Sequence, residues 1–131
     1  MFCLDSDFLI ALLREDKTAV SLLYNLETES LPLTTTPVQA MELFRGAYKS
    51  TESQDNIQRI TNLLNTLEIL PIDLRVADRY AQIQIALQRA GKIIGDFDLI
   101  IAAVVLNHGG LLVTRNTRHF EQIAGLALKS W

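Results

Sequence analysis

The chain has 131 residues, of which 49% are hydrophobic and 21% charged, with a net charge of −3 and a single cysteine. This length suits one domain over residues 1–131, and the composition excludes a disordered chain. The lone Cys3 excludes an internal disulfide. Proteins that hold nucleic acid through a broad phosphate-binding surface are usually basic, so contact with nucleic acid must here be local or depend on a cation.

No basic segment followed by an apolar run and a cleavage site opens the chain, and this argues against export by that route. The apolar stretches are interrupted by charges well short of the ~20 residues that a membrane span needs. Together with the absence of a disulfide, these features predict a cytoplasmic protein that does not enter a membrane.

The first half of the chain alternates short apolar strands with amphipathic helices. Thr36 followed by Pro37 is a strong helix start, because Thr caps a helix well and Pro suits its first position. Apolar spacing predicts the other boundaries. We expect strands at 1–5 and 31–36, helices at 6–14, 18–29, 37–48 and 56–67, and a polar turn at 50–53.

The second half continues the alternation. Asp73 is expected to cap a helix that runs to Ala90 and stops at Gly91. We expect strands at 68–72, 111–114 and 126–130, a loop at 92–96, a buried helix at 97–107, and a turn with a short helix at 116–123. Such alternation is typical of a parallel sheet covered on both faces. The helix pair in 37–67 could project from that sheet as an arm.

Acidic residues stand where the predicted strands end, which is where active sites form in open parallel sheets. Asp5 closes the first strand, and an acid in a buried strand is costly unless it is paired. Glu42 lies about a turn and a half into the helix after the second strand. Asp98 begins the buried helix. Taken alone, Asp98 could be an ordinary helix-start acid and Glu42 a solvated helix residue.

Taken together, these acids predict a site for a hard cation. Mg²⁺ and Mn²⁺ prefer carboxylate and water oxygens, and an ion so held can activate water and neutralise a scissile phosphate. No zinc pattern competes, since His108 and His119 lack a set of spaced partners. The sequence also lacks a P-loop and a dinucleotide-binding glycine motif.

Four segments of the chain resemble the sequence motifs of PIN domains, in order and with compatible spacing. They are residues 4–10 (LDSDFLI), 42–47 (ELFRGA), 94–103 (IGDFDLIIAA) and 112–120 (LVTRNTRHF). Each motif is weak alone, but the four together are specific. The subgroup that the chain resembles most is the VapC-type toxin of toxin–antitoxin pairs.

The resemblance implies a three-layer α/β/α sandwich with a central, mainly parallel sheet. It implies RNA cleavage that depends on Mg²⁺ or Mn²⁺, with Asp5, Glu42 and Asp98 as the catalytic and metal-binding acids. Asp96 is then an auxiliary acid, because many relatives carry one at that position. The resemblance also implies a homodimer and a VapB-type antitoxin that occludes the site.

Two positions depart from the family pattern. Asp7 stands where the family usually has Asn, and it either adds negative charge near the metal or keeps a hydrogen bond to the site. Asn116 stands where many relatives have a fourth Asp. Asn can accept a metal or water contact but adds no charge, so the number of metal ions is open. Ser6 and Asn116 are expected to orient the ligands.

Five basic residues are candidates for local contact with RNA, although for each one a plain solvated charge is the more common explanation. They are Arg14, Arg45, Lys49, Arg115 and Arg118. The expected function is therefore a metal-dependent endoribonuclease. The alternatives are a catalytically impaired RNA- or partner-binding module with vestigial acids, and a metal-dependent phosphatase or DNA nuclease.

Overall fold

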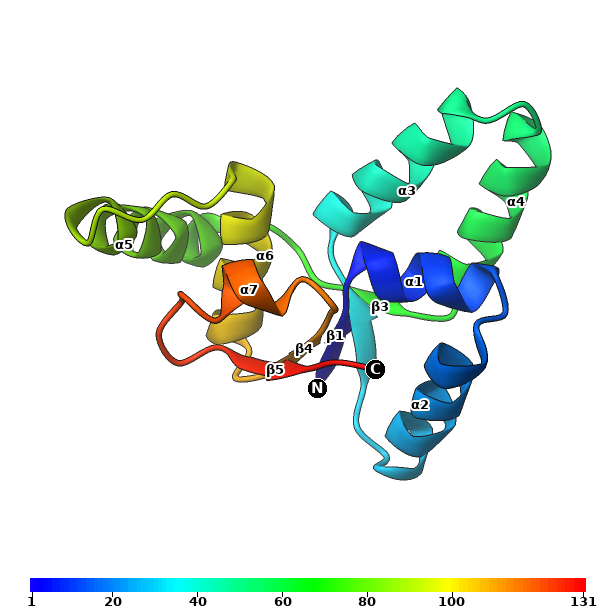
Figure 1. Cartoon of the computed structure of the whole chain (residues 1–131), viewed down its shortest axis with the longest axis horizontal. Coiled ribbons are helices and arrows are strands. Elements are labelled where there is room, and N and C mark those ends of the chain that lie inside the picture. The colour runs from blue at the N-terminus through cyan, green and yellow to red at the C-terminus, as the bar shows by residue number, and fades with distance from the viewer.

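Five strands form one sheet in the order β3-β2-β1-β4-β5 (Figure 1). They are β1 (Phe2–Leu4), β2 (Leu33–Thr35), β3 (Glu68–Ile69), β4 (Leu111–Val113) and β5 (Ala127–Lys129). In this computed structural model, which describes residues 1–131, every neighbouring pair of strands is parallel. The carboxyl ends of all the strands therefore lie along one edge, as the predicted α/β fold requires.

Helices connect the strands and cover the sheet. They are α1 (Ser6–Leu13), α2 (Lys17–Thr28), α3 (Pro37–Lys49), α4 (Ser53–Leu64), α5 (Leu74–Arg89), α6 (Asp96–Asn107) and α7 (Thr117–Phe120). None of these helices combines the length and the apolar character that crossing a membrane would require.

The apolar composition of strand β1 requires helices on both faces of the sheet. Its side chains alternate between the faces, so Phe2 and Leu4 join one apolar core while Cys3 joins another. The first core is completed by α1, α2, α3 and α4, and the second mainly by α5 and α6, with Val38 of α3 and Phe120 of α7. An all-apolar central strand buries its side chains only between two helical layers. The predicted three-layer arrangement is confirmed.

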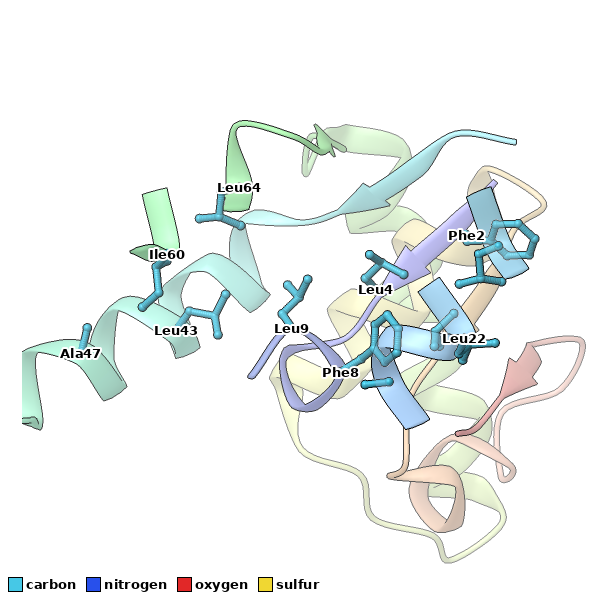
Figure 2. Packing of buried hydrophobic residues seen from close by; sticks show 12 residues of the cluster. Phe2, Leu4, Phe8, Leu9, Leu22, Leu43, Ala47, Ile60 and Leu64 are labelled. Atoms are coloured by element: carbon cyan, nitrogen blue, oxygen red, sulfur yellow. The ribbon is translucent and has the colours of Figure 1, made fainter. Parts of the chain in front are cut away.

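Helices α3 and α4 form a hairpin that extends away from the sheet (Figure 1). The facing sides of its two helices belong to the first core, where Leu43 and Ala47 of α3 meet Ile60 and Leu64 of α4 (Figure 2). The same cluster includes Leu9 of α1. This packing fixes the rotation of α3 against α1, and with it the direction of the α3 residues that face the end of β1.

Several predicted boundaries were wrong by one to three residues; α4 ends at Leu64 rather than residue 67, and β3 ends at Ile69 rather than residue 72. Helix α4 begins at Ser53 rather than residue 56. The prediction missed this start because the first turn is polar and carries no apolar periodicity. Helix α6 begins at Asp96 rather than residue 97, with Gly95 as its N-cap. An acid in the first turn of a helix is favoured by the positive end of the helix dipole, so Asp96 belongs to the helix and not to the preceding loop.

Candidate active site

Asp5 lies directly after β1 and caps α1. Its backbone N–H donates to Val113 O across 3.0 Å, which continues the β1–β4 pairing. One carboxylate oxygen accepts from Ser6 N at 2.9 Å, and the other accepts from the Thr114 hydroxyl at 2.7 Å. Only 6% of the residue is exposed. Burial raises the pKa of Asp5 to about 7, against the effect of these hydrogen bonds and with the help of the neighbouring Asp7 and Glu42 charges.

Glu42 reaches the same place from α3. The hydroxyl of Ser6 donates to Glu42 Oε2, so the residue that follows Asp5 joins the start of α1 to α3. Burial raises the pKa of Glu42, the Ser6 hydrogen bond opposes this rise, and the charges of Asp98 and Asp7 add to it. The acids therefore lie close enough to disfavour one another's ionisation.

Asp98 enters from the first turn of α6. Its Oδ2 lies 3.4 Å from Asn116 Nδ2 and 3.3 Å from His119 Nδ1, and these two nitrogens are 3.3 Å apart. Asn116 also donates its backbone N–H to the Thr114 hydroxyl at 3.0 Å. The turn after β4 thus contacts both Asp98 and, through Thr114, Asp5.

Asp7 ties the start of α1 to the turn after β4. Its Oδ1 accepts from Phe8 N at 2.7 Å, and its Oδ2 accepts from Arg115 N at 2.9 Å. The Thr114 hydroxyl lies 3.4 Å from the same Oδ2. Asp7 thus makes hydrogen bonds to the site, and its negative charge raises the pKa values of Asp5 and Glu42.

The negative charge of this acid cluster (Asp5, Asp7, Glu42 and Asp98) has no Lys or Arg partner. The only ion pair in the molecule joins Asp98 to His119, and it requires a protonated ring. Buried or half-buried acids without a counter-charge are costly. Carboxylate oxygens are the ligands that Mg²⁺ and Mn²⁺ prefer, so the donor chemistry fits such a cation.

The spacing of the acids limits how a cation could be held. No group of three His, Cys, Asp or Glu side chains converges closely enough to hold a metal ion. Mg²⁺ usually keeps several waters and is bound through one or two carboxylates. The arrangement therefore suits a partly hydrated ion rather than a closed cage of protein ligands.

Asp96, the expected auxiliary acid, is turned toward α5. It is exposed, and its Oδ1 accepts from the Tyr80 hydroxyl at 2.7 Å. This bond raises the pKa of Tyr80. Asp98, two residues further on, faces Asn116 and His119 instead.

The five basic candidates lie on several different elements and turns. Arg14 lines a groove between α1, α3 and α4, and Glu42 lies on the wall of the same groove. Arg45, Lys49 and Arg118 are exposed on α3 and α7. The guanidinium of Arg115 lies over the ring of Trp131, 4.4 Å from its centre.

Thr114 and His119 contact the acid cluster, but neither was among the predicted site residues. Thr114 could have been found from the sheet: Leu4 pairs with Val113, so the residues that follow them must be neighbours. His119 stands three residues after Asn116 in the short α7, a spacing that puts both on one side of a helical turn. That signal was present in the sequence but weak.

The fold and the sequence both match known proteins. The family model described as PIN domain matches residues 2–126. A Shigella flexneri protein named tRNA(fMet)-specific endonuclease VapC is 32% identical over 130 residues, which cover 99% of this chain and 97% of that protein. The Haemophilus influenzae Ribonuclease VapC2 is 35% identical over 94 residues, covering 72% of this chain and 71% of that protein.

Two solved structures are similar over almost the whole chain. The VapBC2 structure from Rickettsia felis, bound to a promoter DNA fragment, has a TM-score of 0.90 at 25% identity and covers 99% of this chain and 98% of that chain. The DNA-bound VapBC structure from Salmonella typhimurium has a TM-score of 0.88 at 29% identity, covering 99% and 97%.

Proposed function

The chain belongs to the PIN domain family, and on that premise we propose that it is an endoribonuclease, the toxin of a toxin–antitoxin pair, which hydrolyses RNA phosphodiester bonds with a divalent metal ion. Its relatives of similar length are named VapC endonucleases and ribonucleases. The metal dependence is our inference from the acid cluster, and so are the roles of its residues.

One observation carries the proposal: acids from three separate elements gather at the carboxyl edge of the sheet without a basic partner. Asp5 follows β1, Glu42 lies on α3 and Asp98 lies on α6. The pKa values of Asp5 and Glu42 are raised, and the charge of Asp98 contributes to the rise at Glu42. A fold gains nothing in stability from such an arrangement, whereas a cation would turn the repulsion into attraction.

We assign Asp5, Glu42 and Asp98 to the cation, with one or two of them as direct ligands and the rest acting through bound water. When bound, Mg²⁺ or Mn²⁺ would neutralise charge on the scissile phosphate and activate a water for attack. Asn116 adds no negative charge of its own that would favour a second ion.

The residues around these acids orient them. The Thr114 hydroxyl directs one oxygen of Asp5, so the other is held at Ser6 N. The Ser6 hydroxyl holds Glu42, and Asn116 lies against Asp98. Partners of this kind fix the rotamers of metal-binding side chains.

We further propose an antitoxin partner and a homodimer. The similar structures are VapBC assemblies, and the groove that contains Glu42 has an apolar wall formed by Ile10, Leu13 and Leu43. A partner segment lying in this groove would cover Glu42 of the acid cluster. Ile93 and Phe97 expose large apolar side chains, which supports self-association. Light scattering of the purified chain, alone and with the protein encoded beside it, tests both statements.

Cleavage assays test the activity. Purified protein is incubated with RNA, single- and double-stranded DNA and a small phosphoester, each with Mg²⁺, with Mn²⁺ and with a chelator. We expect cleavage of RNA alone and none with the chelator. Cleavage of DNA or of the phosphoester at a comparable rate would favour the nuclease or phosphatase alternative. RNA binding without cleavage would favour the impaired binding module.

A further inference from the structure

Trp131 lies two residues beyond β5, against the turn that follows β4. The parallel pairing places Lys129 beside Val113, and Thr114 N donates to Lys129 O at 2.9 Å. The chain therefore runs past Thr114 and Arg115 as it leaves the sheet. This brings the indole of Trp131 to the start of α1.

Trp131 makes three contacts there. Its ring packs edge-on against the fully buried ring of Phe8, with centroids 5.0 Å apart and an interplanar angle of 69°. The guanidinium of Arg115 lies over the indole at 4.4 Å. Arg115 Nε also donates to the backbone oxygen of Trp131 at 3.1 Å. Edge-on aromatic pairs and cation–π contacts are both favourable geometries.

Phe8 and Arg115, which Trp131 contacts, are also the two residues whose backbone N–H groups hold Asp7. Phe8 N donates to one oxygen of that carboxylate and Arg115 N to the other. Trp131, Phe8, Asp7 and Arg115 therefore form a closed ring of contacts. Thr114, which directs Asp5, precedes Arg115.

We propose that Trp131 is a positioning residue for the acid cluster. Together with Phe8 and Arg115 it forms what we call the Trp131 clamp, which holds the start of α1 against the turn after β4. The clamp keeps Asp7 bridged between two backbone donors and Thr114 directed at Asp5. The inference rests on the proposed function, since it assigns a role in preparing that site.

The proposal gives Arg115 a structural role in place of the RNA contact expected from the sequence. Its guanidinium is engaged by the indole and by the backbone oxygen of Trp131, and it contributes to lowering the pKa of Asp16 at the start of α2. It therefore supports the loop that carries Thr114 instead of contacting RNA. An RNA contact predicts a raised KM on substitution, whereas a clamp predicts a lowered kcat.

The test uses three single variants, Trp131→Leu, Trp131→Phe and Arg115→Met. A fourth variant combines Trp131→Leu with Arg115→Met. Tyr24→Leu is the matched control, because it removes an aromatic ring that is 67% exposed on α2. Hydrogen exchange of the Arg115 amide reports on its bond to Asp7 without requiring catalysis, so a failure of the proposed function can be told from a failure of the clamp.

We expect Trp131→Leu and Arg115→Met each to lower kcat by about tenfold with little change in KM, the range seen for residues that orient metal ligands. The combined variant should be no worse than either alone, because both break the same ring of contacts. Trp131→Phe should retain most of the activity, since it keeps a ring against Phe8. The hydrogen-exchange rate of the Arg115 amide should rise in Trp131→Leu and stay unchanged in Tyr24→Leu.

The proposal is overturned if Trp131→Leu keeps both the kcat and the Arg115 amide protection of the parent chain. It is equally overturned if the two single losses multiply, or if Arg115→Met raises KM alone. Should Trp131→Leu fail to fold, Arg115→Met and Trp131→Phe decide the question, because they leave an apolar or aromatic side chain in each place. Should the parent chain not cleave RNA, the exchange data still test the clamp.

Discussion

The hydroxyl of Thr114 donates a 2.7 Å hydrogen bond to the carboxylate of Asp5, joining the ends of two adjacent parallel strands. The same oxygen accepts the backbone N–H of Asn116 at 3.0 Å. The bond to Asp5 lowers the pKa of that acid, against the larger effect of burial. Thr114 thus keeps a buried carboxylate both oriented and closer to ionisation at neutral pH.

Replacing Thr114 by Val should therefore weaken metal binding and cleavage together. Val keeps the shape but leaves Asp5 Oδ2 without its hydroxyl donor and Asn116 N without its acceptor. We expect a loss of about 10- to 100-fold in Mn²⁺ affinity or in kcat. Thr114→Ser, which keeps the hydroxyl, should restore most of both. Equal behaviour of the Val and Ser variants would show that the hydroxyl is not what matters.

Asp5→Asn should stabilise the metal-free chain at neutral and higher pH while it abolishes cleavage. The folded pKa of Asp5, about 7, lies above its usual value of 3.8. Asp5 therefore makes its full contribution to the free energy of unfolding when the pH is below its usual pKa. That contribution is lost as the pH rises through its folded pKa. Each pKa unit corresponds to about 1.4 kcal/mol, so the loss amounts to a few kcal/mol at most.

Denaturant unfolding with a chelator present measures this difference. Asn titrates at no pH, and its amide can donate to the Thr114 oxygen where the carboxylate accepted. The two proteins should be similar near about pH 4, and the variant should be the more stable near about pH 8. A variant that is less stable than the parent chain at the higher pH would contradict the assignment of Asp5 as a strained, buried acid.

Ser6→Ala tests the link between α1 and α3. The Ser6 hydroxyl donates to Glu42, and this bond lowers the pKa of that acid. Without it Glu42 is free to rotate and is more easily protonated. We expect cleavage to fall by about tenfold and to require a higher pH for its half-maximal rate. Thr18→Ala is the control, since its hydroxyl bonds to the exposed Asp16 cap elsewhere. An unchanged pH profile in Ser6→Ala would count against a role for Glu42.

Asn116→Asp tests the position where the sequence departs from the expected family pattern. The new carboxylate would lie beside Asp98 and would replace an amide donor by a like charge. Without metal, the variant should therefore be less stable than the parent chain, and with Mn²⁺ it should bind the ion more tightly. Calorimetric titration gives both affinity and stoichiometry. Weaker binding in the variant would show that position 116 does not face the ion.

Much of this site could be anticipated from the sequence because parallel strands end at one edge. Asp5 was placed at that edge by this rule, and the parallel pairing of Leu4 with Val113 brings the residue after β4 beside it. The direction of α3 could not be foreseen in the same way. It depends on how Leu43 and Ala47 pack against α4, and a pairing between side chains of two helices has no local sequence signal.

The direction of each acid on α6 was equally hidden. Asp96 and Asp98 occupy the same first turn, and the periodicity of an almost wholly apolar helix does not say which of them faces the sheet edge. The structure separates them by their partners, Tyr80 for the first and Asn116 for the second. The assignment of these acids to a metal ion remains a prediction.

The most direct test of the central claim measures Mn²⁺ binding and RNA cleavage on the same preparations of the parent chain and of Asp98→Asn. Asp98 is partly exposed at the site, so this substitution should leave the fold intact, which circular dichroism verifies. We predict that cleavage rises with Mn²⁺ occupancy in the parent chain and that both are lost in the variant. Cleavage by the variant at the parent rate, or cleavage by the parent chain that persists in chelator, would contradict the account.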